Sequence, residues 1–250
     1  MKRIEVLDHG YVSLVESWGS EEGIIEAARM STAKGFLGWG LSYECPEHGK
    51  NEKVCCEGGR RKEGDEKLLR FLYENHHATP FEMAGMTIEV QAPIFVFREW
   101  HRHRTQSYNE MSARYTPLPD MNYVPTVERL LINSKTNKQA GTIAGASELT
   151  EEQAEGFRRS IRGVYAVDEA IYQEALLAGV PKELARIHLP VGRYSRMRAT
   201  GNLRGWLGFL TLRMAPNAQY EIRMFANAVG SLIEENFPRT WALFKEQSNG

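Results

Sequence analysis

Residues 86–114 constrain the fold more than any other part of this chain. Apolar side chains occupy every second position of residues 86–90, which predicts a strand with one buried face. Pro93 suits the first turn of a helix, and the apolar character of residues 94–100 predicts that this helix is short and buried. The polar residues 102–114 therefore begin at a helix end, where the backbone can turn toward a ligand.

The rest of the chain alternates between strand and helix patterns, and helices outnumber strands. Residues 2–17 alternate as strands do, while Thr150 and Gln153 have the spacing of a capping box that opens a long helix. We expect a single α+β domain spanning residues 1–250, with helices packed against a mainly antiparallel sheet. Another helix is predicted to begin after an N-cap at Asp65. The remaining predicted helices lie at residues 21–29, 181–186, 202–214 and 218–237.

Residues 34–64 are rich in glycine and hold all three cysteines, which predicts an irregular surface insertion. Cys45, His48, Cys55 and Cys56 offer four zinc ligands, but their spacing fits poorly with paired zinc knuckles. A reduced surface cluster without metal is the preferred interpretation. A second polar stretch, residues 133–147, is predicted to be a mobile loop.

Charge and hydropathy limit the possible functions. The formal net charge of -1 argues against a nucleic-acid-binding module, because such domains usually carry a strong basic excess. No apolar run approaches the roughly 20 residues that span a bilayer, and the N-terminus is too polar for a signal peptide. Three cysteines do not form a secreted disulfide framework. These features predict a cytoplasmic protein that binds neither membrane nor nucleic acid.

Residues 102–114 concentrate cations and hydrogen-bonding groups in one short stretch. One guanidinium group can donate two parallel hydrogen bonds to the oxygens of a phosphate. The serines, Asn109 and Glu110 could form hydrogen bonds with the edge of a heterocyclic base. A solvated basic patch at a helix end is the simpler alternative. However, Glu99 and Glu110 cannot neutralise all the nearby arginines, which favours a small anionic ligand; these arginines are Arg98, Arg102, Arg104 and Arg114.

The same stretch satisfies every fixed position of the pattern R-H-R-x-x-S-x-N-E-x-S-x-R, and it resembles the signature of the flavin-dependent thymidylate synthase family. Residues 77–82 (HATPFE), residues 183–190 (ELARIHLP) and parts of residues 202–222 are similar to further segments of that family. The resemblance covers roughly residues 1–33 and 65–245, and a pattern of this length is highly specific.

This resemblance implies a homotetramer that binds FAD and dUMP at sites shared between subunits, with one arginine of each site supplied by a neighbour. Methylenetetrahydrofolate would supply the carbon, and NADPH would reduce the flavin. The residues implied to contact FAD are His77, Thr79, Arg102, His103, Arg104, Glu110, Asn202, Arg204 and the position of Gly208. Those implied to contact dUMP are Glu99, Arg102, Glu110, Ser112, Ala113, Arg114, Arg186 and Arg213.

Arg213 is implied to be the catalytic residue. A guanidinium near N3 and O2 of uracil favours the deprotonated ring and makes C5 more nucleophilic. The chain departs from the family pattern at four positions: Glu99 stands where glutamine is frequent, Gly208 where asparagine is frequent, and Met83 and Asn217 where histidine is frequent.

Several alternatives remain at this point. The nearest is C5 modification of a related nucleotide such as UMP. A cysteine-dependent thymidylate synthase is disfavoured, because every cysteine lies in the predicted insertion. Ser112 is interpreted as a ligand-binding hydroxyl, since no pattern places a general base beside it.

Overall fold

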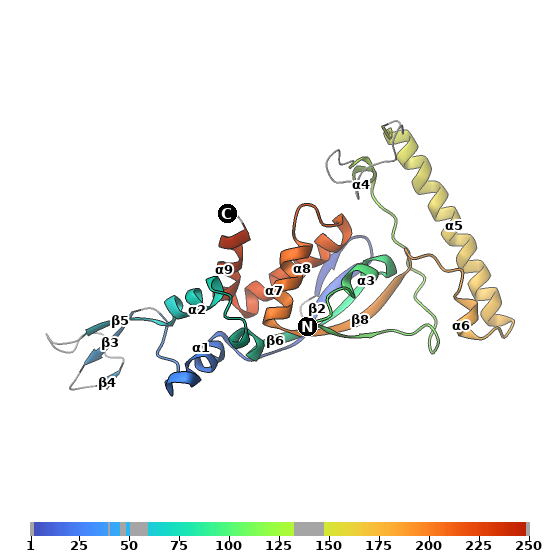
Figure 1. The fold of residues 1–250 in the computed structure, drawn as a ribbon. Helices are drawn as coiled ribbons and strands as arrows, with labels where there is room; N and C mark the ends of the chain where they lie inside the picture. The colour runs from blue at the N-terminus through green and yellow to red at the C-terminus, as the bar shows by residue number, and fades with distance from the viewer. Residues whose placement is uncertain (1–2, 40, 46–48, 51–59, 133–147, 249–250) are drawn as a thin grey trace.

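A five-stranded antiparallel sheet forms the centre of the protein, and helices cover one of its faces (Figure 1). The computed structural model describes residues 3–39, 41–45, 49–50, 60–132 and 148–248. The strand order is β1-β2-β6-β8-β7, and every neighbouring pair is antiparallel. The expected α+β class is confirmed. The strands are β1 (Arg3–Val6), β2 (Gly10–Trp18), β6 (Gly85–Pro93), β7 (Ser107–Glu110) and β8 (Tyr194–Asn202).

The predicted helices are all present, with small changes at their ends. They are α1 (Glu21–Arg29), α2 (Asp65–Glu74), α3 (Ile94–Trp100), α5 (Glu151–Leu177), α6 (Lys182–Ala185), α7 (Leu203–Arg213) and α8 (Tyr220–Asn236). The structure adds α4 (Val127–Leu131), α9 (Pro238–Ser248), strands β7 and β8, and the 3-10 turns η1 (Met30–Thr32) and η2 (Thr79–Met83), none of which the sequence patterns predicted.

The core lies between the sheet and helices α3, α7 and α8. Large aromatic side chains fill it, and Trp100 stacks on Phe209 with ring centroids 4.6 Å apart. Trp206 is fully buried, and its indole Nε1–H donates to the carbonyl of Met86 at 3.0 Å. Burial of each such side chain contributes roughly 2–3 kcal/mol, and ring pairs add to this. The packing fixes α7, which carries several predicted site residues, against strand β6.

Strands β6 and β8 approach closely where β8 leads into α7. Gly85 pairs with Asn202, and a Cβ added to Gly85 would lie 2.4 Å from the carbonyl oxygen of Gly201. Glycine is therefore required there. This close approach sets the start of α7.

Part of the predicted insertion is regular. Strands β3 (Leu41–Cys45), β4 (Gly49–Lys50) and β5 (Arg60–Glu63) form a separate three-stranded antiparallel sheet, so the expectation of irregular structure is wrong for these residues. This sheet and α5 lie on opposite sides of the central part of the molecule (Figure 1). His48, Cys55, Cys56 and the predicted loop at 133–147 lie outside the described residues.

Asp65 holds the chain where the insertion returns to the central part. It is the first residue of α2 rather than its N-cap, which is Gly64, so the N-cap prediction is wrong by one residue. Its buried carboxylate pairs with Arg29 and accepts hydrogen bonds from the backbone N–H groups of Leu37 (2.6 Å) and Gly38 (3.1 Å). The carboxylate therefore has a tertiary role that the local pattern did not indicate.

Helix α5 opens with the predicted capping box and extends away from the central part (Figure 1). Its only buried residues are Ala154 and Tyr172. Large apolar side chains such as Phe157, Val164 and Ile171 are exposed on this helix within one chain. None of the helices in the described residues combines the length and apolar character needed to cross a membrane.

Candidate functional site

The turn that follows α3 is fixed in place by its neighbours. The Trp100 indole Nε1–H donates to Gln106 Oε1 at 3.1 Å, within the core. The Tyr108 hydroxyl donates to the carbonyl of His103 at 2.7 Å and thereby ties the turn to β7. Three buried or half-buried side chains thus hold the segment 101–106, so the side chains it carries are presented on a rigid frame.

Glu99, His103 and Arg213 form one cluster, which we term the Arg213 cluster. The Arg213 Nε–H donates to His103 Nε2 at 2.8 Å, and the same guanidinium forms an ion pair with Glu99 through Nη1. Only 17% of the Arg213 side chain and 26% of the Glu99 side chain are exposed. Arg213 is the last residue of α7, where the helix dipole favours a cation. The structure therefore brings together three residues that the sequence assigned to the flavin and the nucleotide.

His103 is neutral in this cluster. Burial, and secondly the Arg213 guanidinium, lower the pKa of His103 to about 4. A neutral imidazole can accept the Arg213 hydrogen bond at Nε2 and keep its own proton on Nδ1. The His103 ring also packs edge-on against Phe209, with centroids 4.9 Å apart. The imidazole therefore meets the Arg213 guanidinium as an uncharged acceptor.

Acidification is expected to weaken the fold through His103. Its pKa falls from 6.5 to about 4 on folding, so below pH 6.5 the unfolded chain binds the proton more readily. The free energy of unfolding should therefore fall as the pH drops from 6.5 to about 4, by up to about 3 kcal/mol. Urea unfolding at pH 7 and pH 4.5 measures this difference. The His103→Asn variant should lack that part of the pH dependence, and an unchanged dependence in the variant would contradict the assignment.

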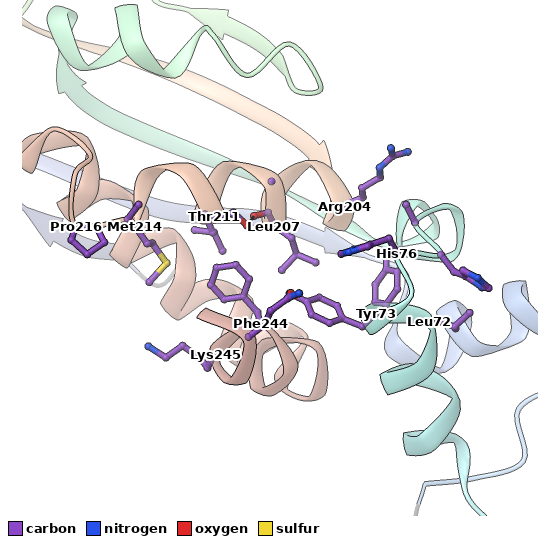
Figure 2. A pocket seen from close by; sticks show the side chains of 17 residues that line it. Leu72, Tyr73, His76, Arg204, Leu207, Thr211, Met214, Pro216, Phe244 and Lys245 are labelled. Carbon is purple, nitrogen blue, oxygen red and sulfur yellow. Dashed lines mark hydrogen bonds between the residues drawn. The ribbon is translucent and has the colours of Figure 1, made fainter. Parts of the chain in front are cut away.

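A cleft of about 830 Å³ opens along α7, from Arg204 to the residues just after the helix, between α7, α2 and α9. Figure 2 shows the rings of Tyr73, His76 and Phe244 facing the side of α7 that carries Leu207 and Thr211. Three residues that the resemblance assigned to FAD also line it, namely His77, Arg204 and Gly208. An added Cβ at Gly208 would meet no atom within 4 Å, so glycine leaves this part of the wall open.

The sequence did not single out several residues of this cleft. Tyr73 lies on α2, while Phe244 and Lys245 lie on α9. The apolar spacing of residues 237–244 could have indicated a C-terminal helix, since Phe237, Trp241 and Phe244 recur at helical spacing and are buried. No local pattern connects that helix with the cleft.

Asn202 and Arg204 are held at the N-terminal end of α7. Asn202 is the N-cap residue, and its Oδ1 accepts from the backbone N–H of Gly205 at 2.9 Å. Arg204 forms an ion pair with Glu82 of η2. Thr79 is the exposed first residue of η2. Of the three predicted residues Asn202, Arg204 and Thr79, only Arg204 belongs to the lining of the cleft.

The remaining predicted residues lie in the turn after α3, in and after β7, and at the end of α6, and most of them are exposed. Arg102 and Arg104 are exposed and form no ion pair with any described residue. Glu110 ends β7, and beyond it the Ser112 Oγ accepts from the backbone N–H of Arg114 at 3.3 Å. Arg114 pairs with Glu183 at 3.3 Å, and more than half of each side chain is exposed. Ala113 is buried, and Arg186 is half-buried at the end of α6.

The predicted residues of this chain are spread along two elements, β8 and α7. Glu110 pairs with Met197 and Asn202 pairs with Gly85, which separates the two positions by about 16 Å along β8 at roughly 3.3 Å per residue. Arg204 and Arg213 lie about 13 Å apart along α7 at roughly 1.5 Å per residue. Within the described residues, no hydrogen bond or ion pair joins Ser112 or Arg114 to the Arg213 cluster.

Comparison with known proteins gives a consistent result. The family described as thymidylate synthase complementing protein matches residues 13–239. A flavin-dependent thymidylate synthase of Thermus thermophilus is 36% identical over 245 residues, covering 97% of this chain and 78% of the relative. One of Thermosipho africanus is 35% identical over 240 residues, covering 96% and 92%.

A solved structure resembles the chain over nearly its full length. The UMP/dUMP methylase PolB from Streptomyces cacaoi, bound with 5-bromo-dUMP, gives a TM-score of 0.75 at 32% identity and covers 97% of both chains. The same methylase bound with 5-bromo-UMP gives the same score and identity.

Proposed function

The chain belongs to the flavin-dependent thymidylate synthase family, and from this premise we propose that it converts dUMP to dTMP. Methylenetetrahydrofolate supplies the carbon, and NADPH supplies the reducing equivalents through FAD. The observation that carries the proposal is the Arg213 cluster. It holds a guanidinium on a rigid helix end, and the exposed Arg102 and Arg104 in the neighbouring turn form no ion pair with the part of the chain that the structure describes.

The cleft beside α7 fits a flavin. Its aromatic and apolar side chains suit a planar ring system, while Arg204 and Lys245 offer cations for a pyrophosphate. His77 and Gly208 line the same space, and the open wall at Gly208 accommodates a ring without a clash. Bound FAD would supply hydride to the nucleotide-bound carbon. The protein residues position the flavin and keep water from the apolar part of the cleft.

Arg213 activates the nucleotide. Its guanidinium stays protonated at neutral pH, so it stabilises negative charge on N3 and O2 of uracil rather than delivering a proton. The neutral His103 adds no positive charge and fixes the guanidinium by accepting from Nε. In water-excluded surroundings such an oriented charge makes C5 of the ring more nucleophilic.

Ser112, Ala113 and Arg114 bind the nucleotide phosphate in this proposal, and they do so in the site of a neighbouring subunit. Glu110, just before them, lies about 16 Å from Asn202 along β8 at roughly 3.3 Å per residue. Among the described residues, no hydrogen bond or ion pair joins Ser112 or Arg114 to the Arg213 cluster, and both observations support a shared site. Helix α5 offers a surface for assembly into the expected homotetramer. Phe157, Val164, Val167 and Ile171 are exposed on it at spacings of seven, three and four residues, which is typical of a seam between helices.

UMP is the second candidate substrate, because the methylase PolB is described as acting on both UMP and dUMP. Purified protein supplied with FAD, NADPH and methylenetetrahydrofolate is incubated with each nucleotide in parallel. We expect dTMP from dUMP, and we expect no dTMP when any one component is omitted. A 5-methylated product from UMP alone would assign the chain to the second candidate. No product from either nucleotide, with flavin bound, would contradict both.

A further inference from the structure

Glu99 holds a position in the Arg213 cluster that suits neither direct phosphate binding nor a purely structural role. Its carboxylate pairs with Nη1 of Arg213, while His103, four residues later, accepts from Nε of the same guanidinium. Two edges of the guanidinium are therefore held by one short segment of chain. A carboxylate facing the nucleotide phosphate would repel it, so contact with Arg213 is the favourable role for Glu99.

The segment that carries Glu99 is rigid. Phe97 and Trp100 of α3 are buried in the core, and the Tyr108 hydroxyl fixes the turn that begins after the helix. Arg213 lies at the end of the well-packed helix α7. Because both partners project from fixed elements, the ion pair restricts a long side chain that would otherwise adopt many rotamers.

The charge of Glu99 has a second consequence. A nucleotide monophosphate carries about two negative charges at neutral pH. The carboxylate beside Arg213 partly cancels the field that attracts this anion. A neutral side chain that still accepts a hydrogen bond would preserve the orientation of Arg213 and strengthen the attraction.

We propose that Glu99 is a positioning residue that orients Arg213 and, through its charge, limits the affinity for the nucleotide. This inference rests on the proposed function, since it assigns the nucleotide to the Arg213 cluster. In this proposal Glu99 acts through Arg213 and does not contact dUMP directly, which differs from the role that the resemblance implied.

The test compares Glu99→Gln with Glu99→Ala in flavin-loaded protein. Glu99→Gln should lower the Kd for dUMP by about tenfold, because it removes one charge near a dianion, and should keep kcat within about threefold. Glu99→Ala should lower kcat by about 30-fold or more, because Arg213 loses its partner, while bound flavin and Tm change little. Glu246→Gln is the matched control: it removes one charge from a surface ion pair with Arg70 and should change neither quantity.

Either of two results with a single variant would overturn the inference: no change in the Kd for dUMP with Glu99→Gln, or wild-type kcat in Glu99→Ala. A fall in kcat of equal size in both variants would also overturn it, since the amide would then fail to replace the carboxylate in orienting Arg213. An inactive wild-type protein would instead count against the proposed function. In that case, calorimetric titration of dUMP into the wild-type protein and Glu99→Gln would still measure whether removing the charge lowers the Kd.

Discussion

Replacing Arg213 with alanine should lower the rate of dTMP formation by at least about 10²–10³-fold, the usual cost of removing a group that stabilises charge in a transition state. The flavin should stay bound, because Arg213 does not belong to the lining of the cleft, whereas Arg204 does. Activity with saturating dUMP, together with the visible spectrum of the purified variant, measures the two effects separately.

Arg204→Ala is the matched control on the same helix. Arg204 lines the cleft and pairs with Glu82, so its removal should weaken flavin binding by about tenfold or more. Saturating FAD should then restore much of the turnover. Loss of flavin from the Arg213→Ala variant, with retention in Arg204→Ala, would show that the two arginines have been assigned to the wrong ligands.

Mixing two inactive variants should restore activity. If Arg114 and Arg213 act in the same site but belong to different subunits, an oligomer containing both Arg114→Ala and Arg213→Ala chains has some sites with both arginines intact. Random combination of the two chains predicts roughly a quarter of wild-type activity, because each half of a site is intact in about half of the cases. The two chains are co-expressed with different affinity tags and purified in sequence through both.

The control pairs Arg213→Ala with Arg213→Gln, which damage the same half of the site. That mixture should stay inactive. If Arg114→Ala with Arg213→Ala gives no more activity than the separate variants, each site would be complete within one chain, and the proposal of a shared site would be wrong.

The sequence predicted the helices and the central strand well because their signals are local. Periodic apolar positions and the Thr150 capping box define α5, and alternation defines β6. Strand β8 escaped prediction although buried and more exposed residues alternate along it, because two of its buried positions are alanine and glycine, which are weak strand signals. Its identity as a strand depends on pairing with β6 on one side and β7 on the other.

The candidate site was predictable residue by residue but not as an arrangement. The pattern of residues 102–114 indicated an anionic ligand, yet the contact between Arg213 and Glu99 joins positions 114 residues apart. Only the packing of α7 against α3 and the following turn brings them together. The cleft likewise combines α2, α7 and α9, which no local pattern connects.

The central claim is that reducing equivalents held on the flavin reach dUMP. In the most direct test, protein-bound FAD is reduced with NADPH in the absence of oxygen and then mixed with dUMP and methylenetetrahydrofolate. We predict that the absorbance of oxidised flavin returns while about one dTMP forms per flavin, since hydride chemistry belongs to the cofactor. Flavin that stays reduced with dUMP unchanged, or dTMP formed by flavin-free protein, would contradict the account.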